Sequence, residues 1–177
     1  MKTIYIHITF LLLFSSTLFA QIKYEGTIDA RYKTMQLDDG SFKYLKYNKK
    51  LQEVIIFNLD NTLWRTVKLP LPKNHYLDEI KLVSLHTFNN DELVELVYSC
   101  VEYDSRNSED PDDDIVIVNF TLNIINEKGD LILKVPDSNE MEIIPSSNQT
   151  KLLIYKHIGQ GFDSKDETLI YSLTNKK

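Results

Sequence analysis

Six acidic residues lie between Asp104 and Asp114 in the stretch EYDSRNSEDPDDDIVIV. Alternate carboxylates in an open loop could converge on one hard cation, and Ca²⁺ prefers several oxygen ligands. An EF-hand is excluded, because Ile115 stands where that loop needs glycine and Thr121 where it needs glutamate. We favour a solvated, self-repelling loop, and the alternative is a calcium-stabilised structural domain. Its irregular Ca²⁺ loop would use Asp104, Asp110, Asp112 and Asp114. No other cofactor is expected.

Histidines are the second group that could do chemistry. His75 follows a turn, His86 is expected inside a strand, and His157 is expected at a strand end. No HxH or HExxH spacing links them to a carboxylate, and the chain has no GxSxG, SxxK, P-loop or GxGxxG motif. We therefore expect no enzyme. The alternative is a small secreted hydrolase whose His/carboxylate site is assembled in space from His86 or His157.

Aromatic residues gather in the first third of the chain. Exposed rings on a β-surface commonly bind sugars or protein partners. Packing is the interpretation we favour, because FKYLKY alternates and could turn Phe42 and Tyr44 inward and Lys43 outward. The group comprises Tyr24, Tyr32, Phe42, Tyr44, Tyr47 and Trp64.

The elements that would position these residues are antiparallel strands. Short runs of Val, Ile, Leu, Tyr and Phe alternate with Asn, Asp and Gly clusters. In VNFTLNI, the apolar residues from Val118 to Ile124 share one face, as a half-buried strand requires. The segment NNDELVELVYSCVEY could begin a helix at Asp91, but its Val and Tyr content favours a strand. The sequence predicts an all-β fold.

A near-repeat indicates how the strands are grouped. The stretches IIFNLDNTLWRTVKLP and LNIINEKGDLILKVP both read as β-hairpins, with Asn61 and Gly129 able to take a positive φ. A third hairpin, LLIYKHIGQGFDSKDETLIYSL, has a longer loop. One four-stranded meander would run through residues 79–86, 93–103, 115–125 and 131–135. Antiparallel four-stranded meanders are typical of propeller blades, but a closed propeller needs at least four blades. We expect a propeller-like but incomplete array, with a two-sheet β-sandwich as the alternative.

The N-terminal residues and the composition indicate the compartment. MKTIYIHITFLLLFSSTLFA has the layout of a secretory signal peptide, so we expect residues 1–20 to be removed and residues 21–177 to form a single all-β domain. No later segment approaches the ~20 apolar residues of a transmembrane helix, so no transmembrane anchor is expected in the mature chain. The formal net charge of −6 does not favour nucleic acid as a partner. Cys100 stands alone among apolar residues and is expected to be buried.

A family resemblance joins these features. The succession EVIIFNLDNTLWRTVKLP, KLVSLHTFNNDELVELVY, LNIINEKGDLILKV, TKLLIYKH and IYSL resembles a propeller-like β module of secreted Bacteroidota proteins. That module often precedes a sorting tag for type IX secretion, and no such tag follows SLTNKK here. The resemblance implies an extracytoplasmic module and supplies no site residues. We expect a secreted, periplasmic or cell-surface recognition or scaffold module that binds a protein or glycan at the cell surface.

Overall fold

The computed structural model describes residues 22–27, 32–106, 115–145, 149–159 and 164–173. The chain divides into two compact units, Met1–Ala30 and Arg31–Lys177. In the first unit, residues 22–27 have no regular secondary structure, and the hydroxyl groups of Tyr24 and Thr27 share a hydrogen bond of 2.6 Å. The predicted signal peptide lies outside the described residues.

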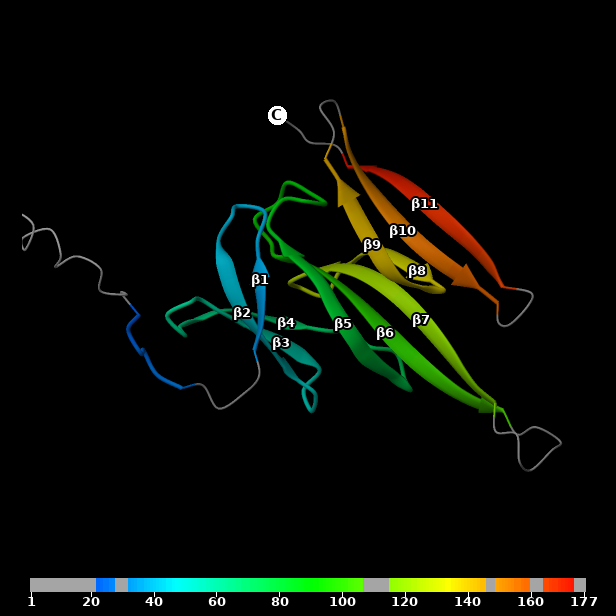
Figure 1. Ribbon diagram of the computed structural model, residues 1–177, viewed down its shortest axis with the longest axis horizontal. Coiled ribbons are helices and arrows are strands. Elements are labelled where there is room, and N and C mark those ends of the chain that lie inside the picture. Colours follow the sequence, from blue (N-terminus) through cyan, green and yellow to red (C-terminus); the bar gives the residue numbers. More distant parts are fainter. Residues whose placement is uncertain (1–21, 28–31, 107–114, 146–148, 160–163, 174–177) are drawn as a thin grey trace, which may run out of the picture. The chain divides into compact units, whose positions relative to one another are not determined.

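The described part of the second unit consists of antiparallel strands and the turns between them (Figure 1). Its strands form three sheets, with the orders β1-β2-β3-β4 (sheet A), β5-β6-β7-β8 (sheet B) and β11-β10-β9 (sheet C). The strands are β1 Lys33–Gln36, β2 Phe42–Asn48, β3 Glu53–Phe57, β4 Leu63–Lys68, β5 His75–Ser84, β6 Glu95–Arg106, β7 Ile115–Asn126, β8 Leu131–Pro136, β9 Ser138–Ile144, β10 Thr150–Ile158 and β11 Lys165–Leu173.

The prediction of antiparallel four-stranded meanders is confirmed. Sheets A and B each follow chain order from one edge to the other, and sheet C does the same with three strands. The meander expected between residues 79 and 135 is sheet B, and the segment that could have been a helix forms β6 instead. The described residues thus form three antiparallel sheets with no closed barrel. The arrangement is sandwich-like, with three sheets where the alternative expected two.

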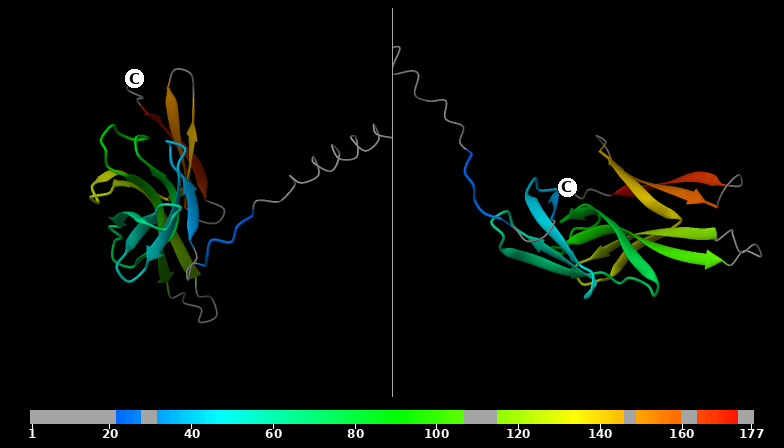
Figure 2. Two further views of the ribbon diagram at one scale, coloured as in Figure 1. Left: turned by 90° about the vertical axis from the view of Figure 1, so that its left-hand side faces the viewer. Right: turned by 60° about the horizontal axis from the view of Figure 1, so that its bottom comes forward.

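Sheet B is covered on both faces (Figure 2). One face contributes Leu96, Tyr98 and Cys100 to a core with sheet A, in which Val54 and Ile56 are fully buried. The opposite face contributes its own buried residues to a second core with β10 and its neighbours in sheet C. These residues are Val97, Leu122, Ile124 and Val135 from sheet B, and Leu152 and Ile154 from β10. The alternation in VNFTLNI predicted a half-buried strand, but both faces are covered, and the polar residues Thr121 and Asn123 are buried opposite Cys100 and Tyr98.

Equivalent turns confirm the near-repeat. In the β3–β4 turn, the N–H of Asn61 donates to the carbonyl oxygen of Asn58 at 3.0 Å, and in the β7–β8 turn Gly129 donates to Asn126 at 2.9 Å. Asn61 has φ 65° and Gly129 has φ 86°, as predicted. Because this left-handed residue closes a three-residue loop with a bulge, each hairpin shifts register next to its turn.

The predicted orientation of β2 is wrong by one residue. Leu45 is buried and Tyr47 packs against the core shared with sheet B, whereas Phe42 is 46% exposed. Tyr44 faces the other way, where its ring contacts Tyr32 edge to face with centroids 5.9 Å apart. Both faces of FKYLKY carry apolar residues, so alternation alone could not decide which of them meets the core.

Two carboxylates hold the loop between β5 and β6. Glu95 is completely buried, and its carboxylate accepts hydrogen bonds from the Ser84 hydroxyl (2.6 Å) and the Asn89 N–H (2.7 Å). Asp38, in the β1–β2 turn, accepts from the N–H of His86 at 2.8 Å. His86 therefore lies in an exposed loop after β5, not inside a strand as predicted. The two carboxylates thus give hydrogen-bond partners to the Ser84 hydroxyl and to the N–H groups of His86 and Asn89, at and after the point where β5 ends.

Candidate binding groove beside sheet C

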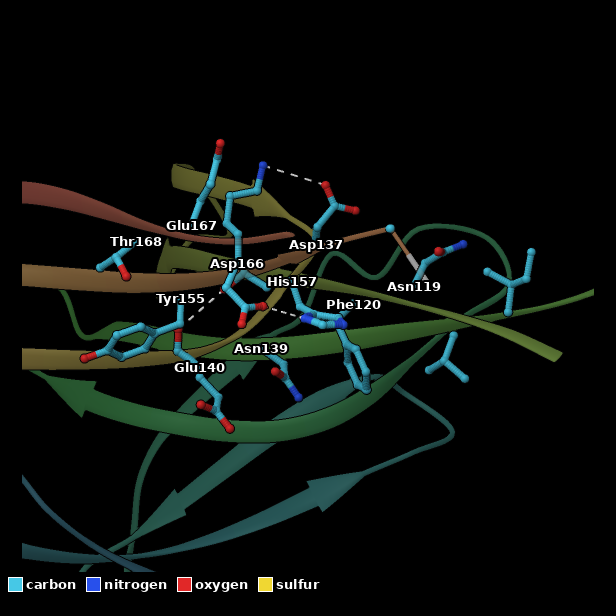
Figure 3. Close-up of a pocket in the computed structure, with 15 residues that line it drawn as sticks. Asn119, Phe120, Asp137, Asn139, Glu140, Tyr155, His157, Asp166, Glu167 and Thr168 are labelled. Atoms are coloured by element: carbon cyan, nitrogen blue, oxygen red, sulfur yellow. Dashed lines mark hydrogen bonds and ion pairs between the residues drawn. The ribbon is translucent and has the colours of Figure 1, made fainter. Parts of the chain in front are cut away.

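A groove of about 930 Å³ lies between β7 and the strands of sheet C (Figure 3). β7 supplies Asn119 and Phe120, and Asp137 connects β8 to β9. Further lining side chains come from three strands of one sheet: Ser138, Asn139 and Glu140 from β9, Tyr155, Lys156 and His157 from β10, and Asp166, Glu167 and Thr168 from β11. Residues more than forty positions apart thus line one concavity.

Asp137 fixes the geometry of the groove through its backbone. It has φ 58°, a left-handed conformation that is uncommon for a residue other than glycine. Its N–H donates to the carbonyl oxygen of Phe120 in β7 at 2.9 Å, and its own carbonyl oxygen accepts from the N–H of His157 at 2.8 Å. One connecting residue therefore ties sheet B to β10 at the groove.

His157 and Asp166 form a pair across the β10–β11 hairpin. The two residues are register partners, and Nδ1 of His157 lies 2.6 Å from Oδ1 of Asp166. Their side chains are 68% and 85% exposed, so water screens the pair. Figure 3 marks the contact between the two side chains with a dashed line. The pair orients the imidazole ring toward the groove and leaves it accessible to a ligand.

Charged and hydroxyl groups make further contacts in and beside the lining, which also includes the apolar residues Ile117 and Val118. Asp137 faces Lys156 at 3.7 Å, and the Tyr155 hydroxyl donates to Glu142 at 2.9 Å. That hydrogen bond to a carboxylate raises the pKa of Tyr155, so its hydroxyl remains a donor over a wider pH range. The groove presents hydrogen-bond donors and acceptors beside the rings of Phe120 and Tyr155. It can therefore bind a ligand that has hydroxyl groups and an apolar face.

Of the four residues predicted for the calcium loop, the structure describes one, and it does not line this groove. Asp104 lies exposed in β6 opposite Ile117, and Asp110, Asp112 and Asp114 lie outside the described residues. No three His, Cys, Asp or Glu side chains within the described ranges are placed to hold a metal. His75 bonds locally to the Lys73 carbonyl oxygen at 3.0 Å. The calcium loop stays a prediction.

His157 is the one predicted histidine that reaches the groove, and its partners were missed. The signal that could have identified Asp166 is the hairpin itself, since pairing Leu152 with Tyr171 brings His157 opposite Asp166. The roles of Asp137 and Asn139 have no such local signal. They depend on how sheet C packs on β7, which is a contact between sheets.

None of the family models, curated proteins or solved structures with which the chain was compared matches it. Within the described ranges, no helix is long and apolar enough to cross a membrane.

Proposed function

We propose that this protein is a recognition module that binds a glycan in the groove beside sheet C and does not transform it. The observation that carries the proposal is the lining, in which amide, carboxylate, imidazole and hydroxyl groups stand beside Phe120 and Tyr155. Sugars offer the complementary pattern, because each ring has several hydroxyl groups and an apolar face that packs on aromatic rings. The predicted signal peptide and the resemblance to secreted Bacteroidota modules support an extracytoplasmic location.

A hydrolase is the second candidate, and the His157–Asp166 pair favours it. An aspartate beside Nδ1 orients a general-base histidine in many hydrolases. Such a site also needs a nucleophile or a held water molecule. Of the aliphatic hydroxyl groups that line the groove, that of Ser138 is buried and bonds to the Glu140 carbonyl oxygen at 3.4 Å, and within the described residues that of Thr168 makes no hydrogen bond to His157. The groove therefore supports binding better than it supports turnover.

A glycan array followed by titration calorimetry tests the proposal. We expect Tyr155→Ala and Asn139→Ala to weaken binding about tenfold each, since each removes a contact worth about 1–2 kcal/mol. Tyr76→Ala and Asn90→Ala are the matched controls, because both residues are exposed and neither lines the groove. These controls should bind as the wild type does.

Two outcomes would contradict glycan recognition. Turnover of glycosides, esters or peptides that disappears in His157→Ala would establish the hydrolase. Binding to a protein partner that is lost in Tyr155→Ala, with no glycan bound, would assign the groove to protein recognition.

A further inference from the structure

The outer edge of sheet C is built differently from the other sheet edges. β11 pairs with β10 on one side, and among the described residues no strand pairs with its other side (Figures 1 and 2). Sheets A and B each have four strands, whereas sheet C has three. An open edge presents unpaired N–H and C=O groups to any extended chain that fits it.

Protective features mark the other edge strands. β1 is short, β4 carries Arg65 in its middle, and β8 carries Lys134 and ends in Pro136. β5 and β9 contain acidic residues, and their pairing is interrupted by bulges. Charges, prolines and bulges at such positions prevent sheets from joining edge to edge.

β11 has none of these features over residues 168–173. This stretch reads TLIYSL, without charge, proline or glycine, and its register with β10 is unbroken. Ile170 is 66% exposed on its outer face, while Leu169 and Tyr171 lie half-buried at the margin of the core with sheet B. The charged residues Lys165, Asp166 and Glu167 are confined to the other end of the strand.

We propose that β11 pairs with β11 of a second copy of this chain, antiparallel about a two-fold axis at Ile170, to give a continuous six-stranded sheet. In this register, Ile170 meets its own copy, and Leu169 lies opposite Tyr171. Thr168 lies opposite Ser172, so the hydroxyl residues also face each other. Over residues 168–172, apolar and hydroxyl residues pair with their own kind, which is the cross-strand arrangement that stabilises a sheet. At the end of the described strand, Glu167 lies opposite Leu173.

Neighbouring registers match the exposed Ile170 less well, since an axis at Tyr171 pairs Leu169 with Leu173 but sets Ile170 opposite Ser172. An axis at Leu169 places Glu167 opposite Tyr171 and Thr168 opposite Ile170. An axis at Thr168 places Asp166 opposite Ile170, which sets a charge against the exposed apolar side chain. The self-complementary register is the argument for a second copy as the occupant, because a two-fold interface must fit itself. The proposal does not depend on what binds in the groove.

Analytical ultracentrifugation of the purified protein at concentrations up to about 1 mM tests for the dimer, because even weak association is detectable there. We expect a monomer–dimer equilibrium that Ile170→Lys weakens at least about tenfold by placing two charges together at the axis. Leu63→Lys is the matched control, since Leu63 is 62% exposed on the edge strand β4. It should leave the equilibrium unchanged, and unaltered thermal midpoints of both variants show that they fold.

The register has its own test. Ile170→Cys should form an intermolecular disulfide under mild oxidation, because directly paired residues have Cα atoms about 4.5–5.5 Å apart. Ser172→Cys should not, since its two copies would lie about 13 Å apart along the strands. A monomer at every concentration, a dimer insensitive to Ile170→Lys, or cross-linking at position 172 in preference to 170 would overturn the proposal.

Discussion

Glu79 shows how a single carboxylate connects two sheets. Lys33 of β1 donates to its Oε1 at 2.7 Å, and Lys81 of β5 donates to its Oε2. These two hydrogen bonds hold the pKa of Glu79 at about 2, below its usual 4.5. The Lys33 Nζ also donates to the carbonyl oxygen of Ile80 at 2.7 Å. The ion pair therefore links the edge of sheet A to the edge of sheet B.

We predict that Glu79→Gln lowers the free energy of unfolding at pH 7 by about 0.5–1 kcal/mol, a small value because water screens this exposed pair. A carboxyl whose pKa is lowered on folding contributes stability above its unfolded pKa and loses it as the pH falls through the folded one. The difference from wild type should therefore shrink between pH 4.5 and about 2. Urea denaturation across this range measures it, with Glu92→Gln, in an exposed loop, as control. A difference independent of pH would contradict the ionic contribution.

Single residues were predictable where a local conformation decides their role. The positive φ of Asn61 and Gly129 followed from the turn sequences, and the burial of Cys100 followed from its apolar neighbours. Burial also raises the pKa of the Cys100 thiol, as expected of a structural cysteine. The loop position of His86 was not predictable, because Asp38 accepts the N–H of His86 from a turn nearly fifty residues earlier.

At the level of elements, the equivalent turns allow a paired test. Gly129 has φ 86°, and a Cβ there would meet only the Lys68 carbonyl oxygen, at 4.0 Å. Space is thus sufficient, and Gly129→Ala should cost about 1 kcal/mol through backbone conformation alone. Asn61→Gly, at the equivalent position, should be neutral or slightly stabilising because glycine adopts φ 65° without strain. Chemical denaturation of both variants measures this. Equal effects of the two changes would contradict the equivalence of the turns.

Alternation predicted the strands better than the faces they bury. Leu122 and Ile124 lie on the buried face expected from VNFTLNI. In β2 the same reasoning chose the wrong face, because the rings of Tyr32, Tyr44 and Phe57 pack together on the side away from the core. A strand with apolar residues on both faces carries no internal signal of its orientation. Which face of such a strand is buried depends on the sheet that packs against it.

At the scale of the whole molecule, sheet B belongs to two cores at once. Cys100 and Leu96 face sheet A, while Val97, between them in the chain, faces sheet C. The sequence predicted three hairpins and their order but not this stacking, since the contacts between sheets join residues distant in the chain. The groove was not predicted for the same reason, because it lies where sheet C meets β7.

Because sheet B is shared, the two cores should unfold together. Ile56→Ala in the core with sheet A and Leu122→Ala in the core with sheet C each empty a fully buried position, and each should cost about 2–5 kcal/mol. Trp64, the single tryptophan, packs against the first core, so its fluorescence reports that core while circular dichroism reports all strands. In Leu122→Ala both signals should shift to the same lower denaturant midpoint. Val118→Ala, on the exposed end of the same strand, should change stability by less than about 0.5 kcal/mol. An unshifted Trp64 transition in Leu122→Ala would instead mean that sheet C detaches while sheets A and B remain folded.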